Sequence, residues 1–262
     1  ITFSGFFSGY LGQTWGWRIP FYLFGGAGLL WSFVLIRFMR DTPNEKSATP
    51  ARMPIGETIA HILGRRSAIA LACAFGCMVY VGVGFHTWMP TYLHEKFGFA
   101  LDKAGFSAVF YHYLCAFFGV LVGGRLTDRW AAKRPSVRFE ANAWGLLLGA
   151  PFIYLMTQTS SEVLCFVMMG LFGLFRGIYD SNLFASLFAV IRPQYRASAT
   201  GLMLSFAFLV GAFSPTVLGV LKSRFGLAFG LASLSGFYVL GGLIILAACA
   251  LYFKKDHAEA AT

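Results

Sequence analysis

The sequence has 262 residues, of which 57% are hydrophobic and 12% are charged. Soluble domains carry about 25% charged residues, so this composition excludes a soluble enzyme, a disordered protein and a disulfide-stabilised scaffold. The net charge of +10 does not indicate nucleic acid, because the Lys and Arg residues lie between long apolar runs and do not cluster on a polar fold. We therefore expect an all-α, polytopic membrane protein with the lipid bilayer as its solvent and no nucleic-acid partner.

The apolar runs are close to the roughly 20 residues that a membrane-spanning helix needs. Residues 1–12 are interpreted as the end of a span, followed by a polar, aromatic turn. Because the chain begins without an initiator Met or a signal-like segment, we expect a fragment that lacks an N-terminal portion. Seven complete spans are predicted after the turn, at 19–36, 68–93, 104–126, 139–156, 162–191, 197–221 and 226–253.

The one sizeable polar stretch, 39–67, separates the first two complete spans. Within it, Ile55, Ile59, Ile62 and Leu63 recur at helical spacing, which predicts a short helix lying in the membrane interface. Further along, Pro215 is expected to kink its helix. Small-residue packing faces are predicted where glycines recur, at Gly119, Gly123 and Gly124.

The distribution of basic residues predicts the orientation of the chain. If the stretch 39–67 is cytoplasmic, 15 of the 21 Lys and Arg residues lie on that side and five on the other, while Arg176 lies inside a span. Cytoplasmic loops carry an excess of Lys and Arg. We therefore expect a multi-pass cell-membrane protein with a cytoplasmic C-terminus, in a bacterial inner membrane.

The span 162–191 carries unusual charges. Arg176, Tyr179 and Asp180 are spaced i, i+3 and i+4 and share a helix face, where Gly173 and Gly177 make the helix thinner. Charged side chains at membrane depth face a cavity or pair with each other. The functional interpretation is a solute or proton site, and the structural alternative is an ion pair that locks neighbouring helices.

Other polar side chains inside spans extend this candidate site. Tyr80, Tyr111 and Asn182 are candidate substrate-binding residues. His112 can carry a proton because histidine titrates near neutral pH, although a hydrogen-bonding role is the alternative, and His86 lies near the end of its span. The sequence shows no nucleophile with a base, no phosphate loop and no paired carboxylates, so we expect no enzyme, no catalytic residue and no cofactor.

The five cysteines all lie inside apolar runs. Cys73 and Cys77 are spaced i, i+4, but no second pair and no histidine at ligand spacing completes a metal site. They are interpreted as small hydrophobic residues, and no metal site is predicted.

A motif in the basic stretch after the span 104–126 resembles a known family. Gly124-Arg-Leu-Thr-Asp128-Arg129-Trp-Ala-Ala-Lys133-Arg134 resembles the cytoplasmic G-x-x-x-D-R-x-G-R-K loop of major facilitator superfamily transporters, with Ala131 in place of the second glycine and the basic pair displaced by one residue. The segments 16–18, 40–43 and 193–201 are similar to other parts of this family. The resemblance covers essentially the whole chain, from the end of the family's helix five through helix twelve.

This resemblance implies a domain organisation. Residues 1–38 would be the end of helix five and helix six of a truncated N-terminal bundle, 39–67 a cytoplasmic central loop, 68–253 the C-terminal six-helix bundle and 254–262 a cytoplasmic tail. Helices seven, eight, ten and eleven line the central cavity in this fold, and the full-length protein is expected to be a monomer.

The resemblance also implies a function. Trp88-Met-Pro90-Thr-Tyr-Leu93 with the following Phe97-Gly98 is similar to the anion:cation symporter branch, which moves organic anions with protons. We expect a secondary transporter of a small organic or sugar-acid anion that works by proton-coupled alternating access, with sodium as the alternative ion. The alternative functions are an exporter or drug/proton antiporter and a non-transporting sensor of the same fold.

Roles for individual residues follow from this expectation. The planar fork of Arg176 suits a carboxylate, Asp180 and His112 are the candidate proton carriers, and the conformational latch consists of Gly124, Asp128 and Arg129. The alternative for the latch is that its basic residues only enforce topology.

Overall fold

The computed structural model describes residues 11, 14–39 and 55–261. The expected span end at 1–12, apart from residue 11, and the part of the polar stretch at 40–54 lie outside these described residues. The chain divides into two compact units, 1–53 and 54–262. The first contributes α2 (Arg18–Phe38), which has a single buried residue, Pro20.

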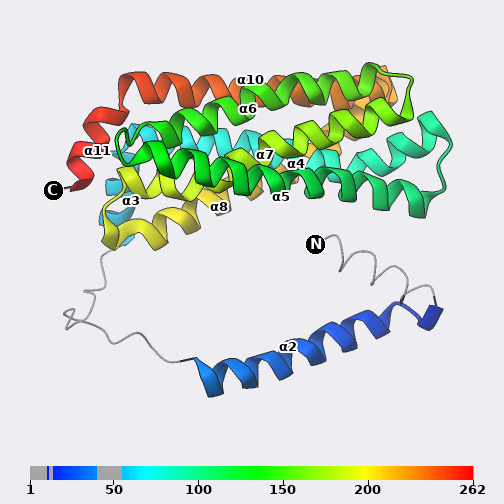
Figure 1. Cartoon of the computed structure of the whole chain (residues 1–262), viewed down its shortest axis with the longest axis horizontal. Helices are drawn as coiled ribbons and strands as arrows, with labels where there is room; N and C mark the ends of the chain where they lie inside the picture. Colours follow the sequence, from blue (N-terminus) through cyan, green and yellow to red (C-terminus); the bar gives the residue numbers. More distant parts are fainter. Residues whose placement is uncertain (1–10, 12–13, 40–54, 262) are drawn as a thin grey trace. The chain divides into compact units, whose positions relative to one another are not determined.

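The second unit is a bundle of helices (Figure 1). All regular structure in the described residues is helical, which confirms the all-α prediction. Its elements are α3 (Ile55–Leu63), α4 (Arg66–Phe97), α5 (Leu101–Ala131), α6 (Val137–Gln158), α7 (Glu162–Val190), the 3₁₀ turn η1 (Pro193–Tyr195), α8 (Arg196–Ala212), α9 (Ser214–Phe225), α10 (Leu227–Leu251) and α11 (Phe253–Ala261).

Six described helical segments are long and apolar enough to cross a membrane: 18–38, 66–97, 101–131, 162–190, 193–225 and 227–251. The predicted span at 139–156 corresponds to α6, which has 22 residues but is not among these six segments. Its apolar run is weakened by Asn142, Pro151 and Gln158. Length and composition thus support six of the seven predicted spans, and the remaining one, 139–156, is present as the helix α6.

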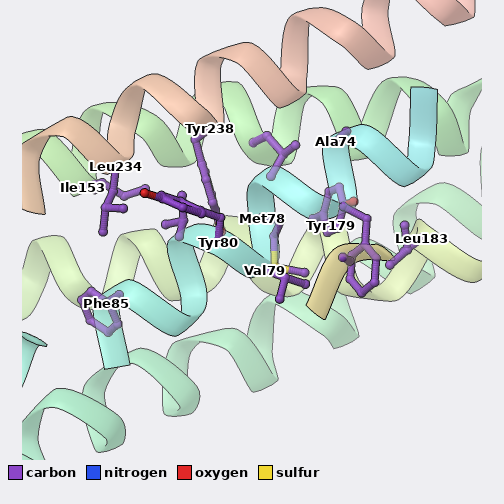
Figure 2. Close-up of a cluster of buried hydrophobic side chains, with 14 of the residues drawn as sticks. Ala74, Met78, Val79, Tyr80, Phe85, Ile153, Tyr179, Leu183, Leu234 and Tyr238 are labelled. Carbon is purple, nitrogen blue, oxygen red and sulfur yellow. The ribbon is translucent and has the colours of Figure 1, made fainter. Parts of the chain in front are cut away.

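The long helices of the second unit pack side by side. α7 contacts α5 on one side and α6 on the other, α10 packs on α6 and α4, and α8 packs on α4 (Figure 1). Side chains from α4, α6, α7 and α10 meet in a buried cluster that includes Tyr80, Ile153, Tyr179, Leu234 and Tyr238 (Figure 2). This arrangement places the middle of α7 inside the bundle.

Glycines bring α5 and α7 into close contact. A Cβ atom built on Gly119 would lie 2.0 Å from the Leu174 carbonyl oxygen, and one on Gly177 would lie 2.1 Å from the Ala116 oxygen. Such distances leave no room for a side chain. Gly124, in contrast, has only an ordinary contact at 4.0 Å, so the predicted packing face is confirmed at Gly119 and at Gly123, where a Cβ would lie 2.8 Å from Ile178 Cα.

The helix break at Pro215 is also confirmed. α8 ends at Ala212 and α9 begins at Ser214, with Pro215 in its first turn. The Trp88 indole N–H of α4 donates to the Pro215 carbonyl oxygen at 3.0 Å. The two helices together form one span, 193–225.

Several boundaries differ from the predicted ones. The motif at 124–134, predicted as a loop, is mostly the last turns of α5, which continues to Ala131. The predicted helix of the polar stretch exists as α3 and packs on α4 within the second unit. The tail also contains a helix, α11, whose buried Asp256 accepts a hydrogen bond from the Ser67 backbone N–H of α4 at 2.8 Å.

Candidate functional site

The guanidinium of Arg176 lies near the middle of α7, with its side chain only 16% exposed. One turn later on the same helix, Asp180 Oδ2 lies 3.5 Å from Arg176 Nε, and the Asp180 side chain is 37% exposed. A buried cation in an apolar bundle needs a compensating charge. Asp180 supplies that charge from the more accessible side of the pair.

Neighbouring helices surround the guanidinium with polar and aromatic groups. His112 of α5 is fully buried, and its Nε2 lies 3.5 Å from Arg176 Nη1. The Tyr113 ring centroid lies 6.0 Å from Arg176 Cζ, at the outer limit of a cation–π contact. On α4, a Cβ atom built on Gly82 would lie 3.2 Å from Arg176 Nη1, so the absence of a side chain there leaves space for the guanidinium.

His86 of α4 belongs to the same cluster. Its ring stacks on Tyr113 with centroids 5.2 Å apart and lies 5.4 Å from the His112 ring. Both ring nitrogens are buried and have no hydrogen-bond partner among the described residues. A buried polar group without a partner is unusual in a native protein, so this part of the bundle is a candidate place for a polar ligand.

The structure thus brings together three of the predicted site residues, Arg176, Asp180 and His112, from two helices. Sequence reasoning missed Gly82, noted Tyr113 beside His112 without assigning it a role in the site, and placed His86 only near a span end. Gly82 and His86 are spaced i, i+4 on α4. This pattern, a small residue one turn before a histidine inside a predicted span, is the sequence signal that could have identified the face of α4 that packs against Arg176.

The other predicted substrate-binding residues lie elsewhere. The Tyr111 ring stacks on Phe166 of α7 at 4.5 Å, whereas Tyr80 stacks on Phe237 of α10 at 4.3 Å. Tyr179 is fully buried in the core cluster, where Figure 2 shows it beside Leu183. None of these three tyrosines contacts the Arg176 guanidinium in the described structure.

Asn182 makes its hydrogen bonds within α7. Its amide nitrogen donates to the Ile178 carbonyl oxygen at 3.0 Å and to Ser181 Oγ at 2.9 Å. The carboxamide nitrogen is therefore already engaged, and Asn182 lies about 1.7 turns away from Arg176 along α7.

The predicted latch residues lie at the C-terminal end of α5. Asp128 Oδ1 accepts a hydrogen bond from Arg138 Nη2 of α6 at 2.9 Å. The Asp128 side chain is 69% exposed, and Arg129 is exposed as well. This ion pair links the ends of α5 and α6.

Comparisons with known proteins agree with this architecture. The family model of the Major Facilitator Superfamily matches residues 1–215. The chain is 28% identical to the probable sulfoacetate transporter SauU of Cupriavidus necator, over 80% of this chain and 52% of that protein. It is 25% identical to the hexuronate transporter of Bacillus subtilis, over 95% of this chain and 60% of that protein. The chain therefore spans about half the length of the curated relatives it matches.

A solved structure shows the same fold. The crystal structure of a bacterial homologue of the human lysosomal transporter Spinster, in an inward-facing and occupied conformation, superposes with a TM-score of 0.65. The identity is 20%, and the match covers 97% of this chain and 64% of that one. Because the family model matches most of the sequence and the helical architecture agrees with it, this chain belongs to the Major Facilitator Superfamily, a family of multi-pass membrane transporters and not of enzymes.

Proposed function

We propose that this protein is a secondary transporter of a small organic anion of the sugar-acid type, coupled to protons. The observation that carries the proposal is the Arg176 guanidinium, held inside the bundle between α4, α5 and α7 with a single carboxylate as its ion-pair partner in the described structure. The named relatives that transport sulfoacetate and hexuronate, both organic anions, support this substrate class.

Arg176 is proposed to bind the carboxylate of the solute. A guanidinium offers parallel N–H donors that match the two oxygens of a carboxylate, a geometry that the lysine ammonium does not reproduce. Burial strengthens this interaction, because the effective dielectric constant inside the bundle is low. In the empty site, Asp180 holds the guanidinium in place and compensates its charge.

Asp180 and His112 are the proposed proton carriers. When Asp180 takes up a proton it loses its charge, so Arg176 is free to pair with the anion, and each solute is then linked to a proton. His112 contacts the same guanidinium from α5 and is the competing carrier. Either residue can couple proton uptake to binding of the anion, because both Asp180 and His112 have Arg176 as a partner.

Transport is proposed to proceed by alternating access, in which two helical bundles rock about a site near the middle of the membrane. The position of Arg176 near the midpoint of the 29-residue helix α7 supports this proposal. The Asp128–Arg138 pair is proposed as a latch that changes partners when the bundles move.

The test is uptake of radiolabelled glucuronate and sulfoacetate into proteoliposomes that contain the full-length protein, with an imposed proton gradient. Arg176→Lys removes one of two charge-assisted hydrogen bonds, each worth about 1.5–3 kcal/mol, so we expect roughly 10- to 100-fold weaker binding. Arg224→Lys, at the exposed end of α9, is the matched control and should leave uptake unchanged.

Asp180→Asn separates coupling from binding. We expect this variant to lose uptake driven by the proton gradient while it retains exchange of labelled for unlabelled solute. If His112→Asn, and not Asp180→Asn, loses gradient-driven uptake while it retains exchange, His112 is the proton carrier. Intact uptake and coupling in the Arg176→Lys and Asp180→Asn variants would reduce the pair to a structural role, and absence of flux for both anions in the unmodified protein would contradict the proposed substrate class.

A further inference from the structure

A groove on the second unit lies apart from Arg176 and opens between α5 and α6, with α7 as its floor. Its volume is about 540 Å³, within the range of about 300–1,000 Å³ typical of ligand sites. The walls are apolar and include Val122, Leu126, Trp130, Trp144, Leu148 and Phe175. We call this site the α5–α6 groove.

The two ends of the α5–α6 groove differ in character. At the turn between α5 and α6 it is bounded by Lys133 and Arg134, whereas Leu148 and Phe175 lie toward the middle of the bundle. Arg134 is paired with Glu140. The Lys133 backbone N–H donates to the Trp130 carbonyl oxygen at 3.1 Å, but the Lys133 side chain has no ion pair or hydrogen bond with any other described residue. Its ammonium is therefore an uncompensated positive charge at the mouth of an apolar groove.

Trp130 lies at the basic end of the α5–α6 groove, whereas Trp144 lies on α6 four residues before Leu148, nearer the middle of the bundle. Trp130 is 55% exposed and Trp144 is 51% exposed. A tryptophan at the end of a span, as Trp130 is, typically lies at the level of the lipid headgroups, where the ring is in an apolar environment and the N–H is hydrated. The groove therefore runs from headgroup level into the hydrocarbon region.

The length of the α5–α6 groove fits one leaflet. On α6 it extends from Val137 to Leu148, twelve residues whose ends are about 16 Å apart along the helix axis. Half of a hydrocarbon core of about 30 Å is about 15 Å. An acyl chain that enters beside Lys133 can therefore lie along the apolar wall through the whole leaflet.

We propose that the α5–α6 groove binds an anionic phospholipid of the surrounding bilayer, with its acyl chain against the apolar wall and its phosphate beside Lys133. The charge of Lys133 selects an anionic headgroup, since basic pockets between membrane helices bind such headgroups. The apolar wall excludes a free anion as the main ligand. This inference is independent of the transported solute.

The proposal is tested on the full-length protein in detergent. Dioleoyl phosphatidylglycerol or dioleoyl phosphatidylcholine is titrated in, and bound lipids are counted by native mass spectrometry. A basic residue at the membrane surface contributes a factor of about five to the binding of an anionic lipid. We therefore expect about fivefold tighter binding of phosphatidylglycerol at one site, and Lys133→Gln should abolish this preference. Arg224→Gln, an exposed basic residue at the other end of the bundle, should leave the preference intact.

A second variant tests the apolar wall. Ala141 lines the α5–α6 groove, and Ala141→Phe should fill it and remove the bound lipid whatever its headgroup. Ala247→Phe, on an exposed part of α10, should not. If Ala141→Phe unfolds, Val122→Phe places the same ring in the groove from α5.

Four outcomes of the lipid-binding measurements would overturn the proposal. They are equal binding of the two lipids, a preference that survives Lys133→Gln, occupancy that survives a filled groove, and displacement of the lipid by glycerol phosphate alone. Crosslinking of the groove to a helix of a second protein in place of lipid would also overturn it, because an interface between proteins would then cover the groove.

Discussion

His61 shows how the environment of one residue outside the membrane spans sets its protonation. Its ring stacks on Tyr195 with centroids 4.2 Å apart, and the Tyr195 hydroxyl donates to Glu57 Oε1 at 3.0 Å. Burial lowers the pKa of His61 below the ordinary 6.5, and the positive charges of Arg65 and Arg192 lower it further, against an opposing effect of Glu57. The neutral ring is therefore the form that the folded protein prefers.

This preference predicts a pH dependence of stability. Because the pKa of His61 is lower in the folded than in the unfolded chain, the unfolded chain binds more protons as the pH falls. The contribution of His61 is complete above the unfolded value of about 6.5 and is lost as the pH falls from there through the folded value. Thermal unfolding of the protein between pH 7.5 and 5 measures this loss.

His61→Phe provides the control, since it keeps a ring against Tyr195 but removes the titration. We expect its melting temperature to fall less between pH 7.5 and 5 than that of the unmodified protein. Identical pH profiles for the two proteins would show that protonation of His61 is not coupled to folding.

At the scale of secondary-structure elements, glycine residues determine how closely two helices pack. α5 and α7 meet through Gly119, Gly123, Gly173 and Gly177, and a Cβ on Gly173 would lie 2.1 Å from the His112 carbonyl oxygen. Small residues allow backbones to pack closely in membranes, where dispersion forces replace the hydrophobic effect between helices. This contact also positions His112 next to Arg176, because each residue lies on one of the two helices.

Substitution in this contact should be costly. Gly119→Ala and Gly177→Ala each place a methyl group against a backbone carbonyl that cannot move aside, and overpacking of this kind costs about 1–3 kcal/mol. Equilibrium unfolding in mixed micelles measures the change. Gly105→Ala, on α5 with no atom within 4 Å of its Cβ position, should be neutral or slightly stabilising, since alanine favours a helix over glycine. Equal stability of all three variants would contradict the close packing.

The basic residues of the second unit are concentrated at one end of the bundle. The N-terminal ends of α4, α6 and α8 and the C-terminal ends of α5, α7 and α10 lie at the same end of the bundle (Figure 1). Most basic residues of this unit lie there, at 65–66, 125–138, 192–196 and 254–255, whereas the opposite end has four, at 96, 103, 222 and 224. By the positive-inside rule, we expect the basic end to face the cytoplasm.

Cysteine labelling in intact cells tests this orientation. In a background without the five native cysteines, Ala132→Cys and Lys255→Cys should react with a membrane-impermeant maleimide only after the cells are opened. Arg224→Cys, at the opposite end, should react in intact cells. Labelling of Ala132→Cys from outside would reverse the predicted topology.

The Asp128–Arg138 pair, proposed as a conformational latch, also concerns the whole molecule, because it would act when the helical bundles move. An exposed ion pair such as Asp128–Arg138 contributes about 0–1 kcal/mol to stability, so Asp128→Asn should scarcely change unfolding. We expect it instead to change the fraction of molecules open to each side, measured by distances between spin labels, and to alter turnover more than solute affinity. The control is Glu95→Gln, which removes an exposed ion pair with Lys222 at the other end of the bundle and should change neither the open fraction nor the turnover. If Asp128→Asn loses solute binding while the conformational balance is unchanged, the latch proposal is wrong.

The sequence by itself determined the properties that depend on local pattern. The lengths of the apolar runs predicted the helices, since burying a helical backbone in lipid requires about 20 apolar residues in succession. Arg176 and Asp180 were predictable as a pair, because the i, i+4 spacing places two side chains on one helix face. The break at Pro215 was equally local, since proline lacks the N–H that a continuous helix requires.

Only the tertiary structure decided which faces of different helices meet. Tyr111 and His112 are neighbours in sequence, yet His112 faces Arg176 while Tyr111 stacks on Phe166, because adjacent residues on a helix point about 100° apart. The space beside Gly82 that accommodates the guanidinium exists only because α4 packs near α7. Such contacts depend on the rotation and separation of whole helices, which are set by interhelical packing and which the pattern within a single helix does not encode.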